Sequence, residues 1–138
     1  EELLAWFEQA IAGLGATYDI RAIAVCTHGA TLALLDEDGK LAYPVISYTS
    51  EKGAEVEQEF YDTFGDPKAL HYDTCTPNVG FANCGKALFY VFSRMPDVWD
   101  RVKTILFYNS YLGYELTGHF GMEPTYLGDH SYLWNFFD

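Results

Sequence analysis

Basic residues are scarce in this chain of 138 residues: eight Lys and Arg stand against 20 Asp and Glu, so the formal charge is −12. Proteins neutralise a nucleic-acid backbone with clustered cations, and they bind an anionic membrane surface in the same way. No run of Lys or Arg is present. The sequence therefore argues against nucleic acid and membrane as partners, but it leaves a local nucleotide site open.

Cysteine is also rare, and long apolar runs are missing. An odd set of three cysteines, Cys26, Cys75 and Cys84, is not typical of a disulfide framework. No stretch has the roughly 20 consecutive apolar residues of a membrane-spanning helix. Residues 1–11 are acidic and amphipathic, unlike the basic and then apolar start of a signal peptide. These features predict a reduced, cytoplasmic protein.

The common catalytic and phosphate-binding motifs are absent. The sequence contains no GxxxxGK[ST], GxGxxG, GxSxG, HExxH or CxxC pattern. His28 follows Cys26, and His71 lies near Asp73 and Cys75, but these spacings match no common zinc site. We therefore predict no catalytic residue and no metal ligand within this chain.

Apolar residues recur at helical spacing in several segments, and Gly and Pro mark their ends. We predict helices at 2–14, 51–63 and 82–94, a short one from Pro96 to Trp99, and one that Asn109 caps and Gly118 ends. Residues 65–81 are predicted to be a loop with one helical turn at 67–71. The tail from Glu123 has no clear period.

Four shorter apolar segments predict strands. They lie at 21–27, 31–36, 41–48 and 104–108, and Asp38-Gly39 is typical of a tight turn between the second and third. Strands that alternate with helices predict an α/β domain in which one mixed sheet is covered by helices.

Polar residues follow the predicted strand 21–27. His28, Gly29 and Thr31 stand where the strand ends and a hairpin begins. Ligands of α/β proteins bind at the carboxyl ends of strands, often beside a glycine, so His28 and Thr31 could face a cleft. The same residues also fit a solvated corner between strand and hairpin, and spacing alone favours the corner.

Residues 23–52, IAVCTHGATLALLDEDGKLAYPVISYTSEK, resemble the N-terminal lobe of FGGY carbohydrate kinases, whose pattern is roughly IGVSGQGHGLVLLDxDGxPLxPAIxWxDxR. Residues 27–32 also resemble TWGVDF of the rhamnulokinase-like members. Segment 86–102 resembles KLLWLKExxPEVFxxx, and segment 105–120 resembles xLLPKDYLxxxLTGEx. The resemblance covers nearly the whole chain, in order, and suggests a rhamnulokinase- or xylulokinase-like relative.

This resemblance implies a ribonuclease-H-like, actin-type ATPase lobe. The chain would be one domain, 1–138, that forms an incomplete N-terminal lobe without its first strand. The start without Met, inside a helical pattern, also predicts missing upstream sequence. The parent would phosphorylate a sugar hydroxyl with ATP and Mg. The family's Asp-x-Gly-Thr phosphate hairpin and its catalytic Asp do not occur here, so this segment alone should bind neither cofactor and should be inactive.

The segment would instead contribute the acceptor-sugar side of the cleft, with the rest of the kinase chain as its partner. The sugar-binding residues that the resemblance implies are His28, Gly29, Ala30, Thr31, Tyr48, Ser50, Asn78 and Asn83. Tyr48 could stack on a sugar face or simply pack at a strand end. Ser50 and Ser110 stand where the family has Asp, which leaves the sugar and the activity of the parent open.

A second interpretation is a non-catalytic carbohydrate-binding or protein-interaction domain. The 11 Tyr and 10 Phe could form a stacking surface for such a role. Modules of this kind are usually built from β-strands, whereas this sequence predicts several helices. A circular dichroism spectrum separates the two interpretations, because substantial helix disfavours the second.

Overall fold

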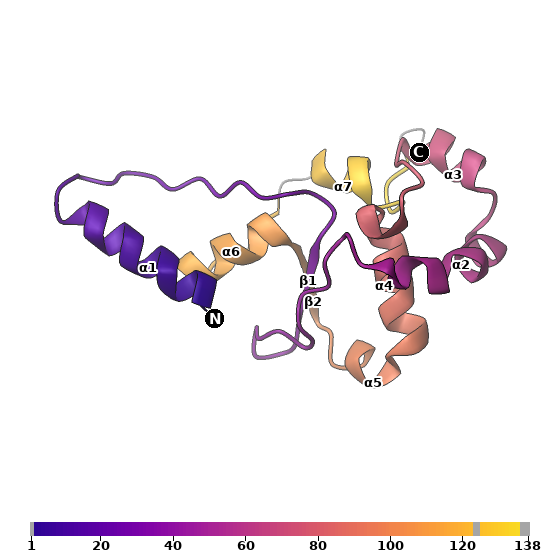
Figure 1. Cartoon of the computed structure of the whole chain (residues 1–138), viewed down its shortest axis with the longest axis horizontal. Coiled ribbons are helices and arrows are strands. Elements are labelled where there is room, and N and C mark those ends of the chain that lie inside the picture. The colour runs from indigo at the N-terminus through magenta and orange to yellow at the C-terminus, as the bar shows by residue number, and fades with distance from the viewer. Residues whose placement is uncertain (1, 123–124, 136–138) are drawn as a thin grey trace.

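The structure is a computed structural model that describes residues 2–122 and 125–135. Figure 1 shows a small central sheet with α1 and α6 on one side and the remaining helices on the other. The elements in chain order are α1 (Glu2–Gly15), β1 (Leu32–Leu35), the 3-10 helix η1 (Glu51–Glu55), α2 (Glu57–Phe64), α3 (Pro67–Thr74), the 3-10 helix η2 (Gly80–Ala82), α4 (Cys84–Arg94), α5 (Pro96–Trp99), β2 (Thr104–Phe107), α6 (Tyr108–Thr117) and α7 (Thr125–His130).

The sheet consists of β1 and β2, which run antiparallel with Leu32 opposite Phe107 and Leu35 opposite Thr104. Successive strand residues point to opposite faces, and here both faces are covered. Leu32 and Leu34 belong to a core cluster that includes Tyr90 and Val91 of α4. The next residues along the strand, Ala33 and Leu35, pack in a second cluster with Tyr111 and Leu112 of α6. The sheet thus joins two cores.

Two of the four predicted strands do not form. Residues 21–27 are an extended loop between α1 and β1, and Ile23 is 54% exposed. A strand needs a partner for its backbone N–H and C=O groups, and no strand pairs with this loop among the described residues. Of residues 41–48, only Leu41 pairs, in a single bridge to Leu35, and Pro44 has no N–H to donate. The α/β class is confirmed, with a smaller, antiparallel sheet.

The predicted turn at Asp38-Gly39 is present. The Asp36 carboxylate accepts hydrogen bonds from the backbone N–H groups of Asp38 and Lys40, at 3.0 and 2.9 Å. Gly39 has a φ of +74°, which suits glycine. The turn therefore leads the chain back beside β1, although β2 rather than residues 41–48 is the partner of β1.

The predicted helices form, with corrections: residues 51–63 are not one helix but divide at Val56 into η1 and α2, and other helices differ at their ends. Where one helical turn was expected at 67–71, α3 continues to Thr74; Asp66 caps it and Pro67 is its first residue. The helix α6 begins at Tyr108, so Asn109 lies inside it and does not cap it. Gly118 ends that helix with a φ of +71°, as predicted. A further helix, α7, forms in the tail.

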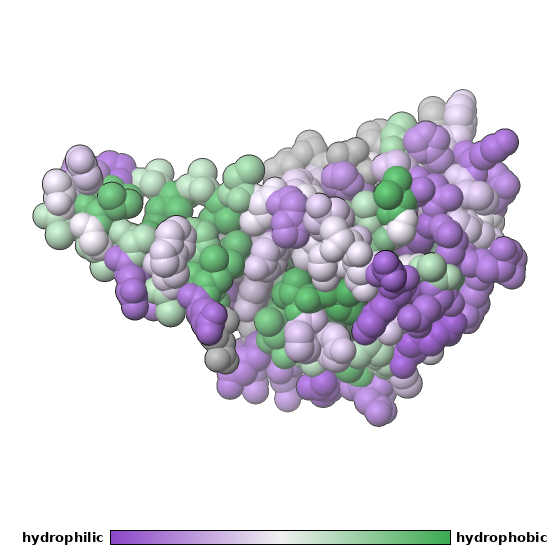
Figure 2. Space-filling view, viewed as in Figure 1, coloured by the Kyte–Doolittle hydropathy of each residue, from purple (hydrophilic) through white to green (hydrophobic). Residues whose placement is uncertain are grey.

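Apolar side chains remain exposed on one end of the molecule. They gather over α1 and the extended loop that follows it, on the face that Figure 2 shows. No residue of α1 is buried, and Trp6 is 61% exposed. Within the described ranges, no helix is long and apolar enough to cross a membrane.

Candidate functional site

His28 lies in an aromatic cluster beside the start of β1. Its ring centroid is 5.0 Å from that of Tyr48 and 5.6 Å from that of Tyr108. Its Nε2 atom is 3.0 Å from Oγ1 of Thr31, which is buried. His28 itself is exposed, so the ring is held on several sides while part of it faces solvent. Tyr108 was not predicted for this cluster.

Gly29 and Ala30 shape the backbone next to His28. A Cβ at Gly29 would lie 2.8 Å from Nε2 of His130 and 3.4 Å from the hydroxyl of Tyr126, so α7 packs directly on this glycine. Ala30 has a φ of +63°, which is uncommon for a residue with a side chain. Its methyl group is buried in the larger core cluster. Both residues therefore position the backbone, and neither brings a polar side chain.

Tyr48 and Ser50 make different kinds of contact although they are close in sequence. Tyr48 belongs to the cluster around His28 and is 38% exposed. The Ser50 hydroxyl accepts from the backbone N–H of Lys52 at 3.4 Å and so caps η1. The cap thus engages the hydroxyl that was predicted to contact sugar.

Asn78 and Asn83 belong to a second polar group centred on Lys86. Lys86 is fully buried, and its Nζ atom donates to Oε1 of Glu57 and to Oδ1 of Asn78, both at 2.5 Å. The hydroxyl of Tyr61 donates to the same Asn78 oxygen at 2.5 Å, and its ring centroid is 4.8 Å from Nζ. Asn83 is buried and caps α4 by accepting from the backbone N–H of Lys86. Sequence reasoning missed Lys86 and Tyr61, although a lysine among the apolar residues of 84–92 was a visible signal.

Tyr61 of this second group and its neighbour Tyr132 remain protonated at neutral pH. Burial raises the pKa of Tyr61, a hydrogen bond from Tyr132 lowers it in part, and the nearby Glu57 charge raises it. Burial also raises the pKa of Tyr132, and its hydrogen bond with Tyr61 acts in the same direction. Tyr61 therefore keeps the O–H that it donates to Asn78.

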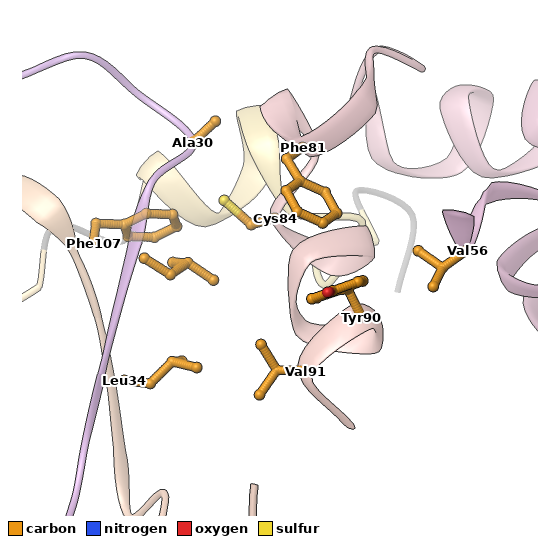
Figure 3. Close-up of a cluster of buried hydrophobic side chains, with 9 residues drawn as sticks. Ala30, Leu34, Val56, Phe81, Cys84, Tyr90, Val91 and Phe107 are labelled. Atoms are coloured by element: carbon orange, nitrogen blue, oxygen red, sulfur yellow. The ribbon is translucent and has the colours of Figure 1, made fainter. Parts of the chain in front are cut away.

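The end of α7 and the residues that follow it contact both groups. His130 packs on Gly29, and two residues later the backbone N–H of Tyr132 donates to Oγ1 of Thr76 at 3.3 Å. The Tyr132 hydroxyl lies 3.4 Å from that of Tyr61. Ala30 stands between His28 and Thr31 in sequence, and Phe81 stands between Asn78 and Asn83. Both belong to one buried cluster (Figure 3). Apart from Ser50, which caps η1, the predicted residues thus form two groups that share a common core.

The donor set does not fit a metal ion. Within the described residues, no three His, Cys, Asp or Glu side chains are grouped so that they could hold one. The two groups can instead offer hydroxyl, amide and imidazole hydrogen bonds together with aromatic faces. Groups of this kind bind uncharged, polar small molecules.

Comparison with known proteins gives a family match over most of the chain. Residues 1–135 match the family described as the FGGY family of carbohydrate kinases, N-terminal domain. An L-fuculokinase from Salmonella typhi is 32% identical over 114 residues, which are 83% of this chain and 24% of that protein. An L-fuculokinase from Escherichia coli K12 is 30% identical over the same shares of the two chains. The chain spans about a quarter of the length of these curated relatives.

Solved structures agree with the family match. A carbohydrate kinase from Novosphingobium aromaticivorans superposes with a TM-score of 0.79 at 28% identity, over 97% of this chain and 27% of that one. A ligand-bound xylulose kinase from Lactobacillus acidophilus has a TM-score of 0.71 at 16% identity, over 85% of this chain and 24% of that one. At that lower identity, the second likeness shows the fold alone.

Proposed function

Because this chain belongs to the FGGY family of carbohydrate kinases, whose N-terminal domain it matches over residues 1–135, we propose that the whole protein transfers a phosphoryl group from ATP to a sugar hydroxyl. The family match is the observation that carries this proposal. The chain, residues 1–138, would be one incomplete N-terminal lobe. The apolar face of α1 and the following loop would then pack against the rest of the kinase chain.

The group around His28 is the proposed acceptor-sugar side of the cleft. Thr31 and the two tyrosines restrict the His28 ring, so its remaining edge can make a directed hydrogen bond to a sugar hydroxyl. The exposed part of Tyr48 can pack on a sugar C–H face. Gly29 and Ala30 would serve by shaping the backbone, and Asn78 would add an amide from the second group.

ATP and Mg are proposed for the whole protein and not for this segment. Phosphoryl transfer needs phosphate-binding amides, a metal ion and a base near the acceptor hydroxyl. The described residues supply no fitting metal site. The contribution of this chain would be to bind and orient the acceptor sugar. We also propose that the whole protein is cytoplasmic.

The sugar to test first is L-fuculose. This proposal rests on the L-fuculokinases that are 32% and 30% identical to the chain. Xylulose is the second sugar to test, on the weaker ground of a shared fold. The alternative of a non-catalytic binding module receives no support from the family match or from the helices that surround the small sheet.

Replacing His28 with alanine in the whole kinase is expected to raise the KM for the sugar. A hydrogen bond to a bound sugar is worth about 0.5–1.5 kcal/mol, so kcat/KM should fall about threefold to tenfold. His28 is exposed and outside the core, so the melting temperature should change little. Steady-state kinetics with L-fuculose and xylulose give the measurement.

His119→Ala is the matched control, because His119 is an exposed histidine beyond the end of α6 and outside both polar groups. It should leave KM at the wild-type value. If His28→Ala also leaves kcat and KM unchanged, the ring only completes the corner before β1, and the proposed sugar site is wrong.

Residues 1–138 alone are expected not to bind Mg-ATP. The reason is chemical: the sequence has no phosphate-binding glycine motif, and the described residues form no metal-binding cluster. Isothermal titration of the chain with Mg-ATP is the test. Saturable binding in the micromolar range would contradict the placement of the nucleotide site outside this segment.

A further inference from the structure

The Asn78 amide is held in one orientation by two donors. Lys86 and Tyr61 both donate to its oxygen at 2.5 Å. An ammonium group has only donors, so the Asn78 atom that faces Lys86 must be the carbonyl oxygen and not the amide nitrogen. The two N–H bonds of Asn78 therefore face away from Lys86. Within the part of the chain that the structure describes, they donate to no protein group, and Asn78 is exposed.

The arrangement of the donors is rigid. Lys86 extends from the first turn of α4, is fully buried, and is also held by Glu57 at 2.5 Å. Tyr61 comes from α2, and its ring lies under the ammonium group of Lys86. The Asn78 loop is thus anchored to two helices through one oxygen atom. An amide fixed in this way presents its donors without losing side-chain freedom when a ligand binds.

We propose that Lys86 and Tyr61 are positioning residues that turn the Asn78 amide outward, so that it donates to a carbonyl or hydroxyl oxygen of the acceptor sugar. The inference rests on the proposed function and goes beyond it by assigning the residues that orient the sugar-binding amide. Glu57 completes the set because it balances the buried charge of Lys86.

Stability alone does not explain a buried lysine at this position. Taking an ammonium group out of water is costly, and buried ion pairs can often be replaced by apolar side chains without loss of stability. A methionine at position 86 would fill similar space in α4. The lysine at this position is explained by the hydrogen bond that its ammonium group donates to the side-chain oxygen of Asn78.

The test is a double-mutant cycle in the whole kinase, with L-fuculose and xylulose as probe sugars and Mg-ATP saturating. Asn78→Ala should raise the sugar KM about threefold to tenfold, with kcat less affected. Tyr61→Phe removes one donor but keeps the ring beneath Lys86, and should raise KM about twofold to fivefold. The KM of the double variant should match that of Asn78→Ala, because the effect of Tyr61 on the sugar passes only through Asn78. Lys86→Met removes the other donor to Asn78 and should raise KM by a similar factor.

Gln58→Ala is the matched control on α2, because Gln58 is exposed and bonds only Asp62 of the same helix among the described residues. It should leave KM unchanged. If Asn78→Ala or Tyr61→Phe shifts the melting temperature but not KM, the network is structural and the inference is overturned. The inference is also overturned if the double variant raises KM by the product of the two single increases, because Asn78 and Tyr61 would then act independently.

His28→Ala separates this inference from the proposed function. A raised KM in His28→Ala with a normal KM in Asn78→Ala overturns only the role of Asn78 and of its positioning residues. A wild-type kinase that phosphorylates neither probe sugar overturns the proposed function together with the inference.

Discussion

Phe81→Ala is expected to destabilise the protein by about 3–5 kcal/mol, the usual cost of removing a fully buried phenylalanine. Phe81 lies in η2, is 1% exposed, and belongs to the larger core cluster shown in Figure 3. Its ring meets that of Tyr90 edge to face at 5.6 Å. A Cβ at Gly53 would lie 3.0 Å from Cδ1 of this ring, so η1 also packs closely against Phe81. The surrounding helices have little room to close the cavity.

Urea unfolding of the wild type and the variant measures this loss. Phe92→Ala is the matched control, because Phe92 lies on α4 but is 55% exposed. Its cost should be below about 1 kcal/mol, in the range of surface substitutions. If Phe81→Ala lowers the free energy of unfolding no more than Phe92→Ala does, the placement of Phe81 in the core is contradicted.

Gly85→Ala is expected to be destabilising even though it places alanine inside a helix. Alanine in a helix normally gains about 0.5–1 kcal/mol over glycine. Here the new Cβ would lie 2.5 Å from the backbone oxygen of Ser131 and 3.2 Å from Oδ1 of Asn83. A backbone atom cannot rotate away as a side chain can, so α4 or the segment after α7 must move. We expect a net loss of about 1–3 kcal/mol, as for other overpacked sites.

Displacement of Ser131 should also reach both polar groups, because its neighbours in sequence are His130, which packs on Gly29, and Tyr132, whose backbone N–H donates to Thr76. The sugar KM of Gly85→Ala should therefore rise together with the loss of stability. The control is Gly113→Ala in α6, where a new Cβ meets nothing within 4 Å. That variant should be neutral or slightly stabilising by thermal unfolding. A gain in stability for Gly85→Ala would show that the close approach of Ser131 is wrong.

The sequence by itself determined the local elements and the family. Helical periodicity placed α1 and α4, and a proline or glycine located the start of α5 and the end of α6. The turn at Asp38-Gly39 was recognisable because a tight turn depends on residues only a few positions apart. Three ordered motifs, carried by residues 23–52, 86–102 and 105–120, were enough to indicate the kinase family, because each motif is a short run of neighbouring residues.

Only the tertiary structure decided which strands pair. The segment 21–27 is apolar over most of its length, yet it remains a loop because no described strand lies beside it. Hydrogen-bond partners of a strand come from distant parts of the chain, as β2 does for β1, and hydrophobic pattern alone does not identify them.

The candidate site divides in the same way. The sequence indicated His28, Thr31 and Tyr48, but Tyr108 joined them only through the pairing of β1 with β2. Asn78 was predicted from its loop, whereas its orientation comes from Lys86, eight residues away, and Tyr61, 17 residues away. Such contacts depend on how whole helices pack, so tertiary structure alone determined which way the amide of Asn78 faces.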